Sequence, residues 1–225
     1  MKFLKNKKVI PALLFIALGF LAMQVPFSQI VGAEGLKFSL FDFYGSIAGA
    51  FIGSVWGLTV VAIMQLSNWV VQGFAMDSAT LIRFLPMLFA VLYFTKQSKW
   101  ILVVPGVAMI AFWAHPEGRA AWYYALYWLI PFVSYIFYKK YLFARALGTT
   151  FTAHSVGSVL FLWVMNLPAE VWTGLVPVVW KERGLMAIGI CLTYMLFNYA
   201  FSFAKKKVKW LQDVKVSPKY SSHKI

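Results

Sequence analysis

The sequence has few residues of the kinds that support soluble and secreted domains. It contains one cysteine, Cys191, and only seven acidic residues, and charged residues make up 12% of its 225 positions. A single cysteine excludes a disulfide framework and a multi-cysteine metal site. Soluble domains carry about 25% charged residues, so this chain has too few to cover a water-exposed surface.

Hydrophobic residues make up 61% of the chain, and its mean hydropathy is +0.73. Seven apolar segments can be marked: Val9–Val31, Tyr44–Val71, Leu81–Phe94, Trp100–Ala114, Ala120–Tyr138, Thr149–Leu167 and Leu185–Phe203. A helix needs about 20 apolar residues to cross a bilayer, so these segments leave no room for a soluble domain. We predict an all-α, polytopic protein of the cell membrane, with a helical bundle over residues 1–204 and a basic cytoplasmic tail over residues 205–225.

Basic residues are three times as numerous as acidic ones, 21 against seven, for a net charge of +14. They form short clusters between the apolar segments, as cytoplasmic loops do under the positive-inside rule. We therefore expect the lipid bilayer, and not nucleic acid, to be the partner of this charge. Four lysines precede Val9, and the apolar stretch after them is long for a signal peptide, so we expect an uncleaved first span.

The positions of the basic clusters bear on the number of crossings. Seven crossings would place the N-terminal lysines and Lys205–Lys209 on opposite sides of the membrane, against the positive-inside rule. Six full spans remove this conflict if Leu81–Phe94, which is short and contains Pro86, is re-entrant or lies against the bundle. Both termini and the Lys96/Lys99 cluster are then cytoplasmic.

Four glycines recur at a strict four-residue spacing: Gly45, Gly49, Gly53 and Gly57. On one helix they would form a smooth groove. Helices in lipid gain little from hydrophobic burial, so close backbone approach through small residues is a main source of their association. Two interpretations stay open, namely packing inside the monomer and docking of a partner subunit.

The predicted outer connection Pro168–Gly184 has an apolar middle too short to span the membrane, and we interpret it as a lid or a re-entrant turn. Aromatic and polar residues there and at the outer ends of the later segments are candidates for binding a solute by stacking and charge pairing. The predicted ligand-binding residues are Trp122, Tyr123, His154, Asn166, Trp172, Trp180, Lys181 and Arg183. The alternatives are an interfacial aromatic belt at Trp122 and Tyr123, a helix-to-helix hydrogen bond at His154, and a solvated loop at Lys181 and Arg183.

No catalytic motif accompanies these residues. Ser155 adjoins His154, but adjacent residues on a helix point about 100° apart and do not face each other. The sequence has no G-x-S-x-G elbow, no H-E-x-x-H zinc motif and no P-loop. We therefore expect no catalytic residue, metal or cofactor. An intramembrane enzyme acting on lipid, with His154 as base, is kept as a third hypothesis.

The arrangement as a whole resembles a known family. A six-span bundle with both ends inside, the glycine-rich stretch Gly45–Gly53 after the first outer loop, and an outer lid before the last span are similar to the substrate-binding S components of energy-coupling factor (ECF) transporters. This architectural overlap covers residues 9–204. The first span departs from the family, because Ala12, Ala17 and Ala22 do not form its Ala-x-x-x-Ala docking face.

The resemblance implies a capture subunit for a vitamin or another micronutrient, which works with a transmembrane coupling subunit and with separate ATPases. A solute-binding transporter subunit is therefore the leading hypothesis. The alternative is an envelope assembly or scaffold protein that recruits a partner through the glycine-rich helix face.

Overall fold

The computed structural model describes residues 8–29, 37–74 and 76–221, and this part of the chain is almost wholly helical. Residues 1–7, which include three of the N-terminal lysines, and residues 30–36, 75 and 222–225 lie outside it. One short antiparallel hairpin is present, formed by β1 (Pro26–Gln29) and β2 (Lys37–Ser39).

The α-helices, in chain order, are α1 (Val9–Met23), α2 (Leu40–Ile52), α3 (Ser54–Val71), α4 (Ser78–Ile82), α5 (Phe84–Thr95), α6 (Val103–Ala114), α7 (Pro116–Ala120), α8 (Ile130–Ile136), α9 (Leu142–Met165) and α10 (Ala169–Ala204). The 3-10 helices are η2 (Lys99–Leu102), η3 (Trp122–Leu129), η4 (Lys209–Leu211) and η5 (Pro218–Tyr220).

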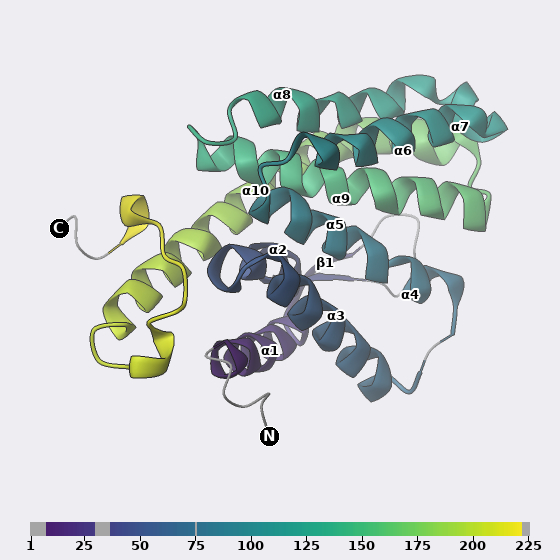
Figure 1. Ribbon diagram of the computed structural model, residues 1–225. Helices are drawn as coiled ribbons and strands as arrows, with labels where there is room; N and C mark the ends of the chain where they lie inside the picture. The colour runs from purple at the N-terminus through teal and green to yellow at the C-terminus, as the bar shows by residue number, and fades with distance from the viewer. Residues whose placement is uncertain (1–7, 30–36, 75, 222–225) are drawn as a thin grey trace.

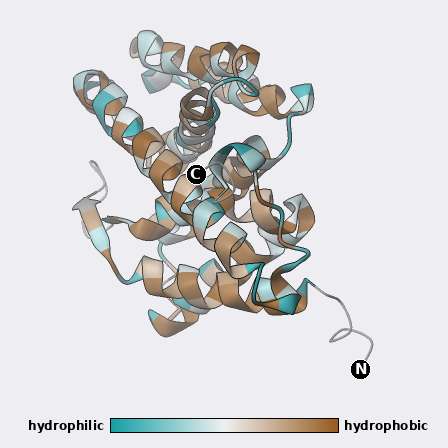
Figure 2. Ribbon diagram, turned by 90° about the vertical axis from the view of Figure 1, so that its left-hand side faces the viewer, coloured by the Kyte–Doolittle hydropathy of each residue, from teal (hydrophilic) through white to brown (hydrophobic). Residues whose placement is uncertain are grey.

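Four helical segments of the described chain are long and apolar enough to cross a membrane: Ser54–Val71, Ser78–Thr95, Leu142–Met165 and Ala169–Ala204. Hydrophobic residues make up much of the helical ribbon (Figure 2), and on α10 the large apolar residues Leu185 and Leu196 are 67% and 64% exposed. This composition and length support an all-α membrane protein with several membrane-compatible helices. The second of the four segments includes Leu81–Phe94, which the sequence alone left as the weakest span.

Asp77 starts that segment by capping α4. Its carboxylate accepts hydrogen bonds from the Thr80 hydroxyl at 2.6 Å and the Thr80 backbone N–H at 2.8 Å. These bonds, led by the one from the hydroxyl, hold the pKa of Asp77 below its usual range. An aspartate at this position satisfies a helix N–H that has no partner within the helix.

The glycine-rich segment is two helices and not one. Gly53 adopts a φ of +92°, which favours glycine, and it separates α2 from α3. A Cβ on Gly57 would collide with the backbone of Gly49, so the two helices meet at these two glycines. The expectation of four glycines on one continuous helix face is therefore corrected, because the turn at Gly53 folds the face back on itself.

The predicted outer loop Pro168–Gly184 is also helical. It forms the first half of α10, which continues for 36 residues and contains Pro177. The lid interpretation is thus corrected, because the residues from Ala169 onward, Gly174 and Pro177 apart, are compatible with a helix that starts directly after Pro168. The carbonyl of Pro168 already accepts a hydrogen bond from the Val171 N–H at 3.1 Å.

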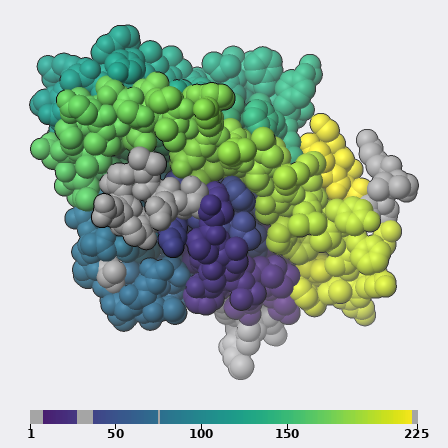
Figure 3. Space-filling view, turned by 180° about the vertical axis from the view of Figure 1, so that it is seen from behind, coloured from purple at the N-terminus to yellow at the C-terminus, as the bar shows by residue number. Residues whose placement is uncertain are grey.

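Two hydrophobic clusters share α9 and α10. The larger joins α1, α2, α3, α5, the first turns of α9 and the second half of α10. The smaller joins α6, η3, the rest of α9 and the first half of α10. Figure 1 shows α9 running beside α6 and α8 and also beside α5. From behind, α1 lies between α3 and the second half of α10 (Figure 3). The ring centre of Phe15 in α1 lies 6.3 Å from that of Phe197 and 5.6 Å from that of Phe201.

The described part of the basic tail, residues 205–221, packs against the bundle. Leu211 and Val214 are 4% and 1% exposed and belong to the larger cluster. The Lys215 N–H donates to the Phe51 carbonyl at the end of α2, and the Ser217 N–H donates to the Asn198 side chain. The tail therefore covers one end of the bundle.

The Gly49–Gly57 contact makes a prediction about stability. Gly57→Ala should lower the free energy of unfolding by about 1–3 kcal/mol, because backbone must move to admit the methyl group. Gly184→Ala makes the same chemical change where no atom lies within 4 Å of the new Cβ, and it should leave stability unchanged or raise it. Thermal unfolding in detergent, followed by tryptophan fluorescence, measures both. Equal stability of the two variants would contradict the packing described here.

Candidate functional site

A cavity of about 540 Å³ lies between α9 and α10 on one side and α2, α3, α4 and α5 on the other. Its wall includes Tyr124, Trp172 and Val179 from the smaller hydrophobic cluster and Phe41 and Met87 from the larger one, so it sits where the two clusters meet. Binding pockets for small molecules usually measure about 300–1,000 Å³ and are often built between helices of a bundle. The size and place of this cavity fit that class.

On the α9 side, His154 belongs to a chain of hydrogen bonds. The Trp128 indole N–H donates to His154 Nδ1 at 3.1 Å, and His154 Nε2 lies 2.9 Å from the Tyr124 hydroxyl. Because an indole can only donate, Nδ1 must accept, and the ring is neutral with its proton on Nε2. Nε2 then donates to Tyr124, and Tyr124 can donate to Ser158 at 3.3 Å.

This network occupies both ring nitrogens of His154. The lone pair of His154 Nδ1 already accepts from Trp128, and Nε2 carries the proton. The neighbouring Ser155 hydroxyl donates to the Thr152 carbonyl at 2.8 Å and is fully buried. His154 and Ser155 therefore do not form an acid–base or nucleophilic pair.

On the α10 side, Trp172 and Arg183 line the cavity and are 2% and 7% exposed. The Arg183 guanidinium donates to Glu182 at 2.8 Å and lies 4.9 Å from the centre of the Phe38 ring. Its Nε–H is buried and has no hydrogen-bond acceptor. A buried donor of a charged group without a partner is costly, so this atom marks a place where something else can bind.

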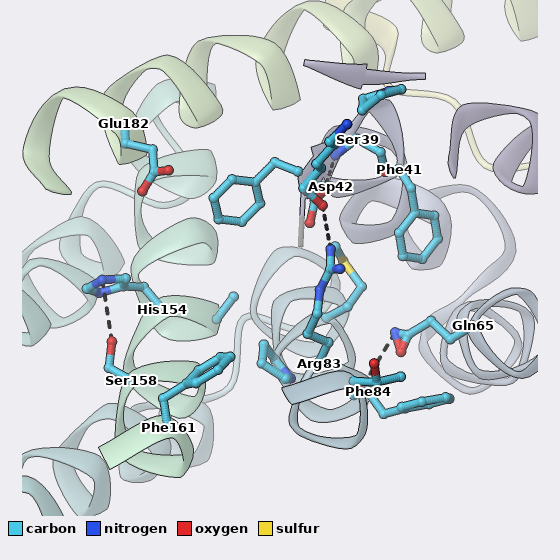
Figure 4. Close-up of a pocket in the computed structure, with 18 of the residues that line it drawn as sticks. Ser39, Phe41, Asp42, Gln65, Arg83, Phe84, His154, Ser158, Phe161 and Glu182 are labelled. Carbon is cyan, nitrogen blue, oxygen red and sulfur yellow. Dashed lines mark hydrogen bonds between the residues drawn. The ribbon is translucent and has the colours of Figure 1, made fainter. Parts of the chain in front are cut away.

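The opposite wall carries a second pair of charges. Asp42, in the first turn of α2, accepts the Ser39 N–H at 2.7 Å, which completes a capping motif. Arg83 points toward Asp42 (Figure 4) and donates to the Lys37 carbonyl at 2.6 Å. The side chains of Asp42 and of Arg83, which lies between α4 and α5, are thus both bonded to the β2 strand beside the cavity.

Gln65 of α3 completes this wall. Its amide nitrogen donates to the Phe84 carbonyl at 3.4 Å, while its Oε1 is buried without a donor (Figure 4). Aromatic side chains surround these polar groups: Phe41, Trp69, Phe84, Phe161 and Trp172. Apolar walls with a few polar atoms that lack partners are typical of a site for a small organic molecule.

The structure brings together three of the eight sequence-predicted binding residues, since His154, Trp172 and Arg183 line the cavity. The other five do not line it, and all are exposed: Trp122, Tyr123, Asn166, Trp180 and Lys181. Asn166 ends α9 in a left-handed conformation with φ of 48°, which asparagine tolerates.

Helix periodicity explains which α10 residues reach the cavity. Trp172, Val179 and Arg183 are spaced by seven and four residues and lie on one face, whereas Trp180 and Lys181 turn away from it. A loop has no such periodicity, so the prediction of a loop over Pro168–Gly184 could not separate residues that face the cavity from those that do not. Had this segment been taken as a helix, the spacing alone would have separated Arg183 from Lys181.

Sequence reasoning left out most of the opposite wall. Asp42 could have been found as part of a helix start, because Ser39-x-x-Asp42 before an apolar run is a helix-start signal. Gln65 and Asn68 lie in the apolar segment Tyr44–Val71 and Arg83 lies in Leu81–Phe94, where polar residues are costly, and this signal could have identified them. Tyr124 was indistinguishable from the aromatic residues around it, because its role depends on a contact with α9.

The described part of the chain holds no group of three or more histidine, cysteine, aspartate and glutamate residues that could bind a metal ion. A second, smaller cavity lies at the other end of the bundle, where the Gly53 turn meets the tail. Its charged lining residues are Lys96, Arg145 and Lys215.

No family model matches the chain, and no solved structure matches it. An uncharacterized protein of Methanocaldococcus jannaschii is similar to it, with 22% identity over 91% of this chain and 76% of that protein. The name of this relative assigns no activity, so function must be argued from the cavity.

The hydrogen-bond chain through His154 makes a testable prediction. His154→Leu should cost about 1–3 kcal/mol of stability, because the buried Trp128 N–H loses its acceptor. Adding Trp128→Phe removes that donor, so the double variant should lose less stability than the two single variants lose in sum. Trp163→Phe is the control. The Trp163 indole donates to the Ala111 carbonyl and not to His154, so its effect on stability should add to that of His154→Leu. Additivity of the first pair within about 0.5 kcal/mol would contradict the network.

Proposed function

We propose that this chain is the solute-binding subunit of a micronutrient transporter in the cell membrane. The observation that supports this most strongly is the cavity, where buried polar atoms without partners face an aromatic interior between membrane-compatible helices. Polar groups at such a depth are costly and are kept where they serve a solute or an ion. The resemblance to ECF S components is compatible with this proposal.

We propose further that both termini are cytoplasmic. The tail, the Gly53 turn, Lys96 and Arg145 lie together at one end of the bundle, and a Cβ on Gly53 would come within 3.8 Å of Lys8 Nζ. Of the described acidic residues, Asp42 and Glu182 line the cavity near the other end. Cations at one end and the solute cavity near the other are what an outward-facing capture subunit requires.

The sequence reached this orientation with six full spans by leaving Leu81–Phe94 out of the count. The helices suggest a second route, which we favour. In this route the α2–α3 hairpin begins and ends on the outer side, so it makes two passes where the six-span route counted one. The segment formed by α4 and α5 is long enough to make one further crossing. The number of crossings is even by either route, and the two routes differ in where the loop after α3 lies.

That loop provides the test of topology. In a Cys191→Ser background, Ser78→Cys should react with a membrane-impermeant thiol reagent applied to intact cells, because our route places it outside. Lys99→Cys should react only after the membrane is opened, and it serves as the control. Protection of Ser78→Cys in intact cells would support the six-span route and contradict the hairpin arrangement.

The scaffold alternative relied on a glycine-rich face for its partner. Gly49 and Gly57 contact each other, and a Cβ on Gly45 would come within 3.1 Å of Phe41 and Met87, so these positions are occupied inside the chain. The lipid-acting enzyme relied on His154 as a base, and both of its ring nitrogens are engaged. The transporter subunit, energised by a coupling subunit and separate ATPases, is therefore the function we favour.

Gly157 offers a way to test solute binding at the cavity. It lines the cavity, and a Cβ there would meet only Pro86 at 3.5 Å, an ordinary contact, so Gly157→Leu should fill the cavity without breaking the fold. Purified protein is screened by thermal shift against a panel of vitamins and nucleobases. A true ligand at 100 times its Kd should stabilise the protein by about 2.7 kcal/mol.

Gly157→Leu should abolish that stabilisation, whereas Gly174→Leu should keep it, since Gly174 does not line the cavity and has no atom within 4 Å of a new Cβ. Absence of any shift across the panel, or an equal shift in both variants, would overturn the proposed function.

A further inference from the structure

Arg183 is the group in the cavity whose bonding is least complete. It is 7% exposed, and its side chain meets one carboxylate, that of Glu182, through one terminal nitrogen. Its Nε–H is buried and has no acceptor. A guanidinium offers a planar fork of donors that matches the two oxygens of a carboxylate or phosphate, and here part of that fork is unused.

The charges on the cavity wall have the same implication. The basic residues that line it are Lys37, Arg83 and Arg183, and the acidic ones are Asp42 and Glu182. Three cations against two carboxylates leave an excess of one positive charge, because His154 is neutral in its hydrogen-bond network. The excess favours an anion over a neutral or cationic solute, and Arg183, the buried cation of the three, attracts it most strongly.

The remaining wall describes the rest of the ligand. Phe41, Phe84, Phe161 and Trp172 supply aromatic surface for an organic body, and Gln65 Oε1 is a buried acceptor without a donor. A single excess charge matches a monoanion better than a phosphate monoester, which carries nearly two charges at neutral pH. The volume of about 540 Å³ admits a molecule with one or two rings.

We infer that the cavity binds an organic monocarboxylate with an aromatic or otherwise flat body, whose carboxylate accepts a hydrogen bond from Arg183 Nε–H. Where the body of the ligand carries a donor, as the indole N–H of indole-3-acetate does, Gln65 Oε1 accepts a hydrogen bond from it. This inference rests on the proposed solute-binding function and adds the chemical class of the solute.

The test compares acids with their own amides, which share shape but lack the charge. The full-length protein in lipid nanodiscs is titrated at pH 7.5 with three pairs: nicotinate and nicotinamide, benzoate and benzamide, and indole-3-acetate and indole-3-acetamide. At least one acid should bind about tenfold or more tightly than its amide, as expected for a charge-assisted hydrogen bond.

Two variants locate the preference. Arg183→Gln should reduce the acid-to-amide ratio to about threefold or less, and Arg183→Lys, which keeps the charge but not the fork, should retain part of it. Arg119→Gln is the matched control, because Arg119 is exposed on α7 and lies outside the cavity. Size-exclusion profiles establish that each variant is folded, and the wild-type ratio stands even if Arg183→Gln is not.

Three results would overturn the inference: amides that bind as tightly as acids, no binding of any acid, or an unchanged preference in folded Arg183→Gln. In each case the thermal-shift panel tests the proposed solute-binding function independently. A neutral or cationic compound whose binding is lost in Gly157→Leu would keep the solute-binding function while refuting the carboxylate.

Discussion

The contact between Gly49 and Gly57 is the constraint on which the rest of the structure depends. Gly53 reverses the chain, and the absence of side chains at Gly49 and Gly57 allows α2 and α3 to meet backbone to backbone. The start of α2 and the end of α3 consequently reach the same end of the bundle. Asp42 and Gln65, 23 positions apart in sequence, therefore share one cavity wall.

This hairpin also relates the fold to the membrane. Lipid offers no hydrogen bonds to the backbone, so a chain reversal must lie where protein or water can satisfy it. The Gly53 turn lies against the tail, where the Lys215 N–H bonds to the Phe51 carbonyl, and beside Lys96 and Arg145. The basic end of the bundle is thus also the end at which the chain turns and the tail packs.

The general class of the protein followed from composition, and the details of the site did not. Membrane-length apolar segments predicted an all-α membrane protein, and four membrane-compatible helices bear this out. The glycine spacing predicted close helix packing but not the turn inside it, because a four-residue repeat looks the same on a straight helix as on a hairpin. Only the positive φ of Gly53 separates the two.

The site residues divide in a similar way. His154 could be selected because ionisable residues in apolar segments are rare and costly. Arg183 could be selected because a cation in a predicted outer loop can pair with an anionic solute. The separation of Arg183 from Lys181, and of Trp172 from Trp180, depended on assigning a helix to residues 169–184. Tyr124 and Trp128 could not be selected at all, since they acquire their role from contacts with His154 across 30 and 26 positions of sequence.

The cavity has an unpartnered Arg183 Nε–H on one wall and an unpartnered Gln65 Oε1 on another. A bound solute would supply hydrogen-bond partners for these two atoms. The most direct measurement is an experimental density map of the protein purified in lipid nanodiscs together with a bound solute. The account predicts density for a small organic molecule between Arg183, Gln65 and Trp172. A collapsed cavity in which Arg183 Nε bonds to a protein acceptor, or a lipid chain threaded through the site, would contradict it.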